Sequence, residues 1–246
     1  MNTELYLTLL RNNINKIDWR ELSLNPEAIR LLEENIDKIH WPYLSLNPAA
    51  IHLLEANQEK INWISLSSNP EAIHLLEANP KKVDWLRLSS NPAAIELLEA
   101  NPKKIVWHKL SLNPAAIHLL EANPDKINWV NLSENPEAIH LLTENPNKID
   151  WQRLCINPAA IHLIEANPNA INYWMTLSLN PLAIHLLEAN PEKINWMFLS
   201  KNSGAIHLLQ ANQDKIDWSM FCQNQLKPLY KYWLENIVST NEYIMK

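Results

Sequence analysis

A tryptophan recurs every 22 residues along most of this chain, and this period constrains the fold more than any other feature. One interval, before Trp174, is 23 residues long. A period of this length is typical of solenoids and other repeat arrays, in which each unit buries its apolar face only against its neighbours. The sequence therefore predicts a repeat array rather than a globular enzyme core. The ten tryptophans of the series are Trp19, Trp41, Trp63, Trp85, Trp107, Trp129, Trp151, Trp174, Trp196 and Trp218.

Each repeat predicts one α helix followed by one short helix, as residues 135–151 illustrate. Asn135 suits the N-cap of a helix over 137–144, and the proline after it suits the first helical position. Asn145 ends that helix, because a residue before proline avoids the α region. Asp150 then caps a single helical turn, α or 3-10, in which the Trp and the Leu three residues later share one side. Helices this short are marginal alone, so packing between repeats must stabilise them.

These elements predict an all-α fold, a single elongated α solenoid of about ten 22-residue units. The period begins near residue 17 and ends near residue 218. We therefore expect an N-terminal cap over 1–16, the repeat solenoid over 17–218 and a C-terminal capping helix over 219–246.

The composition excludes several classes of function. The chain has one glycine, Gly204, whereas phosphate-binding loops and dinucleotide fingerprints need several for close backbone approach. Its net charge is −6 and its pI is 5.8, so a protein that binds nucleic acid is not expected. Cys155 and Cys222 lie in different repeats and make no metal-ligand spacing.

The same sequence predicts a soluble, intracellular protein. Its N-terminus lacks the basic and apolar regions of a signal peptide, and no stretch approaches the roughly 18 apolar residues of a membrane helix. Two cysteines in separate repeats are consistent with a reducing compartment.

Two punctuation motifs resemble those of a known repeat family. Leu132-Ser133-Glu134-Asn135-Pro136 and Glu121-Ala122-Asn123-Pro124 stand where the leucine-rich variant repeat has similar motifs in a slightly longer unit. That resemblance implies α and 3-10 helices stacked into a right-handed superhelix. Members of the family can carry an iron–sulfur cluster on clustered cysteines, which this chain lacks, so no cofactor or catalytic residue is carried over.

The sequence of the repeat unit is also similar to that of tandem-repeat proteins of amoeba-infecting giant DNA viruses, over roughly residues 17–218. This resemblance implies a location in the host cytoplasm or the virion.

A column of histidines lies on the polar side of the predicted longer helix, beside a column of glutamates. A metal-binding or pH-sensitive ladder is one interpretation, because imidazole titrates near neutrality. However, ridges roughly 8–10 Å apart are too far for adjacent imidazoles to share one ion. A solvated face is the simpler interpretation, and we expect no metal. The histidines are His52, His74, His118, His140, His162, His185 and His207.

Two further columns are expected to be structural. The Trp column predicts a buried seam rather than a cofactor site. The Lys that follows each Trp by 19 residues in most repeats is expected to pair with nearby Glu, at no more than about 1 kcal/mol for each exposed pair. No carboxylate pair stands out from the repeat and no serine has an activating partner, so we expect no catalytic residue.

The two positions after each Trp differ in every repeat, while the Trp and the following Leu hardly change. We expect these positions to form one exposed strip that binds a protein partner, because exposed apolar patches often mark partner surfaces. Drift at unconstrained positions is the alternative, although drift favours polar residues. The candidate partner-binding residues are Tyr43, Ile64, Leu86, Arg87, His108, Val130, Arg153, Met175, Met197 and Phe198.

The sequence therefore predicts a non-catalytic binding or scaffold protein that presents an extended surface to a protein partner. The alternative is a structural component that assembles with itself, for example in a virus particle or factory. Neither hypothesis involves nucleic acid, a membrane or a cofactor.

Overall fold

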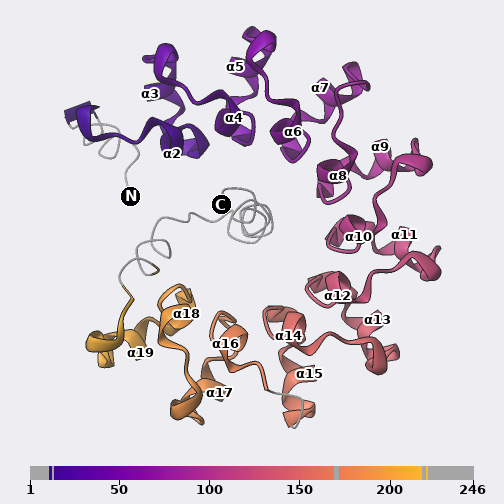
Figure 1. The fold of residues 1–246 in the computed structure, drawn as a ribbon, viewed down its shortest axis with the longest axis vertical. Coiled ribbons are helices and arrows are strands. Elements are labelled where there is room, and N and C mark those ends of the chain that lie inside the picture. Colours follow the sequence, from indigo (N-terminus) through magenta and orange to yellow (C-terminus); the bar gives the residue numbers. More distant parts are fainter. Residues whose placement is uncertain (1–10, 13, 169–171, 218–219, 221–246) are drawn as a thin grey trace. The chain divides into compact units, whose positions relative to one another are not determined.

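The computed structural model describes residues 11–12, 14–168, 172–217 and 220, and these contain helices and turns but no strand. The chain divides into two compact units, Met1–His118 and Leu119–Lys246. Within each unit, successive repeats pack side by side, which confirms the predicted all-α solenoid (Figure 1). The predicted caps lie largely outside the described residues and, like the handedness of the superhelix, stay predictions. Among the described helices, none has the length and apolarity needed to cross a membrane.

Two rows of α helices make up each unit (Figure 1). One row, the Trp helices, comprises α2 (Trp19–Leu24), α4 (Trp41–Leu44), α6 (Trp63–Leu66), α8 (Trp85–Leu88), α10 (Trp107–Leu110), α12 (Trp129–Leu132), α14 (Trp151–Leu154), α16 (Trp174–Leu177) and α18 (Trp196–Ser200). The other row, the Ile helices, comprises α3 (Ile29–Glu33), α5 (Ile51–Ala56), α7 (Ile73–Ala78), α9 (Ile95–Glu99), α11 (Ile117–Glu121), α13 (Ile139–Glu144), α15 (Ile161–Ala166), α17 (Ile184–Glu188) and α19 (Ile206–Ala211). Within each unit, the Trp helices lie on the inner side of the curve.

Short 3-10 segments connect the two rows. Those before the Ile helices are η2 (Pro26–Ala28), η4 (Pro48–Ala50), η6 (Pro70–Ala72), η7 (Pro92–Ala94), η9 (Pro114–Ala116), η11 (Pro136–Ala138), η13 (Pro158–Ala160) and η16 (Ser203–Ala205). Those before the Trp helices are η1 (Ile14–Lys16), η3 (Ile36–Lys38), η5 (Gln58–Lys60), η8 (Pro102–Lys104), η10 (Pro124–Lys126), η12 (Pro146–Lys148), η15 (Pro191–Lys193) and η17 (Gln213–Lys215).

The predicted helix over 137–144 is therefore two elements, η11 and α13. Ala138, between them, has φ −93° and ψ 10°, in the bridge region, where α-helical hydrogen bonding does not continue. Asn135 and Asp150 cap their helices as predicted: their Oδ1 atoms accept from the N–H groups of Glu137 at 3.0 Å and Arg153 at 2.9 Å. The Trp helix after Asp150 is one α turn rather than a 3-10 turn.

Leucine and alanine side chains form the core of each unit. In the repeat around α7 and α8, Ala72, Leu76 and Leu88 are fully buried. The same columns are buried in the other repeats, and the alanine column lets neighbouring backbones approach closely. The core is thus apolar except where asparagine and serine side chains enter it.

A buried asparagine ladder connects successive repeats. The Asn directly before the segment that leads into an Ile helix caps that segment through Oδ1, and its Nδ2 group donates to carbonyls of the preceding repeat. Nδ2 of Asn91 donates to the carbonyls of Ser67 and Asn69, both at 3.2 Å. Its Oδ1 accepts from the Ala93 N–H at 3.1 Å. The amide is fully buried and uses both of its polar ends. The asparagines that donate in this way are Asn47, Asn69, Asn91 and Asn113 in the first unit and Asn157, Asn180 and Asn202 in the second.

A serine column makes a second connection. The Oγ of Ser67 donates to the Trp63 carbonyl at 2.8 Å and accepts from the Asp84 N–H of the next repeat at 2.9 Å. Ser23, Ser45, Ser89, Ser133, Ser178 and Ser200 do the same. In these repeats the Ser hydroxyl accepts a hydrogen bond from the next repeat, and the Asn amide donates to the preceding one.

We expect Asn91→Ala to lower the free energy of unfolding by about 2–4 kcal/mol, because it removes the cap on the Ala93 N–H and leaves the buried Ser67 carbonyl without its donor. Urea denaturation followed by circular dichroism measures this loss. Asn147→Ala, at an exposed position of η12, is the matched control and should change the free energy by no more than about 0.5 kcal/mol. Equal effects of the two substitutions would contradict a structural role for the ladder.

Candidate functional site

The first position after the Trp is exposed in the described repeats, as predicted, except at Pro42, which is half-buried. Ile64, Leu86, Val130, Met175 and Met197 expose 56%, 41%, 45%, 48% and 42% of their surface. His108 is exposed as well. These residues lie two positions before the Leu that each Trp helix buries, and therefore on roughly the opposite side of the helix from it. Together with the second position after each Trp, they form a strip along the Trp helices of each unit, which we call the variable strip.

The second position after each Trp is not uniformly exposed, which corrects the prediction of two equivalent positions. Tyr43, Arg87 and Phe198 are half-buried, Thr176 is buried, and Arg153 is exposed. This position faces the preceding repeat, as two contacts show. Arg153 forms an ion pair with Glu134, and Arg20 Nη2 donates to the Tyr43 hydroxyl at 3.1 Å. Tyr43 and Arg153 are thus held by a neighbour, and the half-buried side chains at this position present only part of their surface.

Tyr43 is the most firmly positioned residue of the strip. The Arg20 guanidinium lies 4.9 Å from the centre of its ring, and the His40 ring meets it edge-on at 4.8 Å. Burial lowers the pKa of His40 and the Arg20 charge lowers it further, while Asp18 and Glu21 oppose the shift. The neutral imidazole is therefore favoured where it packs against Tyr43.

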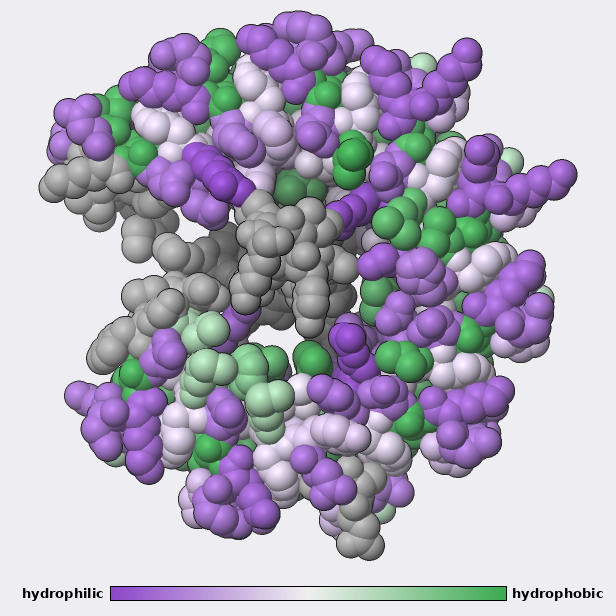
Figure 2. Space-filling view, in the orientation of Figure 1, coloured by the Kyte–Doolittle hydropathy of each residue, from purple (hydrophilic) through white to green (hydrophobic). Residues whose placement is uncertain are grey.

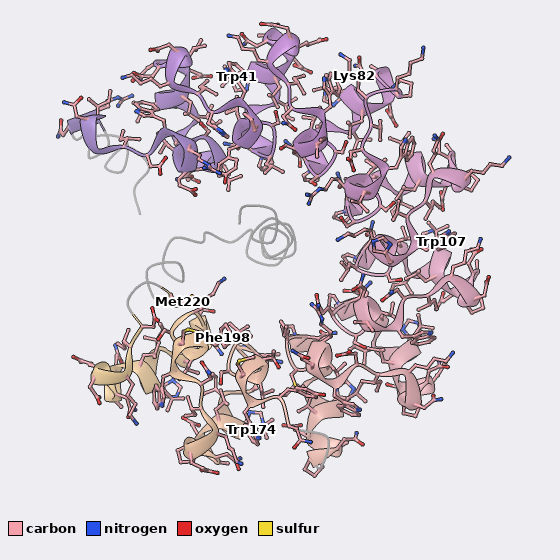
Figure 3. The ribbon with its side chains drawn as sticks, in the orientation of Figure 1. Trp41, Lys82, Trp107, Trp174, Phe198 and Met220 are labelled. Atoms are coloured by element: carbon pink, nitrogen blue, oxygen red, sulfur yellow. The ribbon has the colours of Figure 1, made fainter. Side chains whose placement is uncertain are left out.

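Apolar side chains gather on the variable strip of the second unit. Figure 2 shows them over α16 and α18. In Figure 3, Phe198 and Met220 lie on the side of the Trp helices that faces away from the Ile helices. The labelled Trp41, Trp107 and Trp174 instead point toward the Ile helices. The variable residues and the tryptophans thus occupy opposite sides of the Trp helices.

The tryptophans of the column from Trp19 to Trp196 are only half-buried, which corrects the prediction of a buried seam there. A lysine from the following repeat lies over the ring: Lys82 Nζ is 4.5 Å from the centre of the Trp63 ring, and Lys148 Nζ is 4.4 Å from that of Trp129. Lys38, Lys60 and Lys215 make the same contact with Trp19, Trp41 and Trp196. Cation–π contacts of this kind contribute about 0.5–1 kcal/mol each at exposed sites. These lysines therefore contact tryptophan rings rather than the glutamate partners expected for them.

The histidine column is exposed, as predicted, and it pairs with the glutamate column. His140 Nε2 lies 2.8 Å from Glu121 Oε1, and five more pairs have the same form at 2.6–2.9 Å. His162 aligns with Thr143 instead of a glutamate. Each paired histidine has one carboxylate neighbour, and no group of three or more metal ligands occurs among the described residues. The pairs could have been predicted, because a Glu precedes each paired His by 19 or 20 residues.

Cys155 occupies the serine column in the repeat before the 23-residue interval. The extra residue moves the next N-cap position from residue 172 to Tyr173, which is 40% exposed, as predicted. The Cys155 thiol contacts Thr176 of the next repeat instead. Burial raises the pKa of Cys155 to about 11, although the hydrogen bond with Thr176 opposes the shift. The connection between repeats is thus different at the one place where the period changes.

We expect Cys155 to resist alkylation in the native protein, because a thiol with a pKa of about 11 is protonated at neutral pH and buried. The measurement is the rate of labelling by iodoacetamide in a Cys222→Ser background, native and in urea. Labelling should be slow in the native protein and fast after unfolding. Fast native labelling at neutral pH would show that the thiol is accessible and would contradict this packing.

No protein family, curated protein or solved structure matches the chain.

Proposed function

We propose that this protein is a non-catalytic scaffold that binds a protein partner through the variable strip. The observation that supports the proposal is the composition of the strip. Three of the five arginines of the chain (Arg20, Arg87 and Arg153) and three of its five methionines (Met175, Met197 and Met220) directly follow a Trp at the first or second position. Arg, Met and aromatic residues are the types enriched in protein–protein interfaces.

The remaining repeat positions support this division of roles. The Asn and Ser side chains of the Leu-Ser-x-Asn-Pro motif are used in connections between repeats, and the Lys and Trp columns contact each other. Among the described residues, the histidines with a glutamate neighbour form simple pairs. These polar groups are used in contacts within the stack of repeats. The side chains of the variable strip can change type without altering those contacts. Enzymatic activity is therefore not part of the proposed function.

A structural component that assembles with itself is the second candidate. The resemblance to tandem-repeat proteins of giant viruses favours it, and it would place the protein in the host cytoplasm or the virion. Light scattering over a range of concentrations distinguishes the candidates, because a strict monomer disfavours self-assembly.

We expect the combined substitution Leu86→Ser, Met197→Ser and Phe198→Ser to lower partner capture at least tenfold, because loss of a single interface hot spot costs about 2 kcal/mol. Proteins that the wild-type chain retains from an extract of its native cell are identified first. Capture is then the amount of each of these proteins that the variant retains. Circular dichroism should show unchanged helicity.

The matched control replaces Ile36 and Leu182 with serine. Both are exposed apolar residues, at 43% and 54%, and neither follows a Trp. Capture should be unaffected by this control. Equal capture by the strip variant and the wild type would contradict the proposal.

A further inference from the structure

Three successive Trp helices of the first unit, α6, α8 and α10, carry a mixed apolar and basic part of the variable strip. Its apolar residues are Ile64 and Leu86, which expose 56% and 41% of their surface. Its basic residues are Arg87 and Lys109, both half-buried, beside the exposed His108. We call these five residues the α6–α10 surface.

The charge of the strip is opposite to that of the whole chain. The chain has 21 Lys and Arg against 27 Asp and Glu. The described positions of the strip hold four cations (Arg20, Arg87, Lys109 and Arg153) and one anion (Glu21). A local excess of cations on an otherwise acidic protein attracts acidic ligands to that place.

The acidic group beside Arg87 is already held by the backbone. Asp84 is the N-cap of α8, and its Oδ1 accepts from the Arg87 N–H at 2.8 Å. This bond holds the carboxylate at the start of the helix. Asp84 therefore stabilises α8, and its charge lies next to the surface without pairing with the guanidinium.

Arg87 lacks a side-chain partner, unlike Arg11, Arg20 and Arg153, which pair with Glu34, Tyr43 and Glu134. Among the described residues, its guanidinium makes no hydrogen bond or ion pair. A guanidinium presents a planar fork of donors that fits a carboxylate with two parallel hydrogen bonds. With Leu86 next to it in the chain, Arg87 offers a binding position for an anion beside an apolar side chain.

We propose that the α6–α10 surface binds an acidic, partly apolar segment of a partner protein. An Asp or Glu carboxylate of the segment pairs with the Arg87 guanidinium, Lys109 adds a second attraction, and apolar side chains of the segment pack on Ile64 and Leu86. The inference rests on the proposed function and names the chemistry of the partner.

Selection from a displayed library of random peptides tests this assignment. The purified chain is compared with the double variant Arg87→Glu/Lys109→Glu. The control, Lys81→Glu/Lys103→Glu, makes the same change of charge at exposed positions of the same unit that do not belong to the strip. Bound peptides are sequenced, and their affinities are measured at low and high salt.

The wild type and the control should select peptides rich in Asp, Glu and apolar residues. The double variant should bind these peptides at least tenfold more weakly, and added salt should weaken their binding to the wild type. No selection, or selected peptides without excess acidic residues, would overturn the assignment, as would an equal loss in the control.

Two outcomes separate this inference from the proposed function. If selected peptides are apolar but not acidic, and the Leu86, Met197 and Phe198 substitutions abolish their binding, the scaffold function stands and the acidic partner is wrong. If the chain associates with itself and Arg87→Glu/Lys109→Glu abolishes the association, the occupant is a second copy, and the assignment to a separate partner is wrong.

Discussion

The buried asparagine amide is the interaction on which the repeats of each unit depend. Each one caps a 3-10 segment with its oxygen and donates to two carbonyls of the preceding repeat with its nitrogen. Hydrogen bonds of this kind contribute about 0.5–1.5 kcal/mol each when made, but an unpaired buried amide costs about 1–3 kcal/mol. The ladder therefore specifies how neighbouring repeats align. Helices of four to six residues persist because they are held at both ends by these polar connections and between by buried Leu and Ala.

Much of this arrangement follows from local pattern. The period, the caps at Asn135 and Asp150 and the exposure of the residue after each Trp could be predicted, because each depends on residues within one or two turns. The contacts between repeats could not. Whether the Asn91 amide reaches Ser67, or Lys82 reaches Trp63, depends on the distance and rotation between neighbours, which helical periodicity does not contain. For the same reason, the partial burial of Tyr43 and Arg87 was missed: these side chains face the preceding repeat.

The candidate site consists of positions that the asparagine and serine connections between repeats do not use. Each repeat uses Trp, Leu, Ser, Asn and Lys for packing against its neighbours. The side chains on the other side of each Trp helix can therefore be replaced without weakening that packing. A rigid scaffold with freely variable side chains is a common basis for binding proteins. The Arg, Met and aromatic residues on that side are the chemical evidence for a partner, and the tightly held Tyr43 reduces the entropy lost on binding.

The asparagine ladder has a consequence for how such a chain can change in length. A ladder bond joins a side chain to main-chain carbonyls, so nearly any repeat can accept any other as its neighbour. A whole unit of 22 residues could be gained or lost by recombination, and the new junction would have the bonds of the old one. The junction after Cys155 keeps the ladder bonds, made by Asn180, and differs only in the second connection, where the thiol contacts Thr176. Length is thus an evolvable property of the array, because the ladder tolerates even a junction with one extra residue.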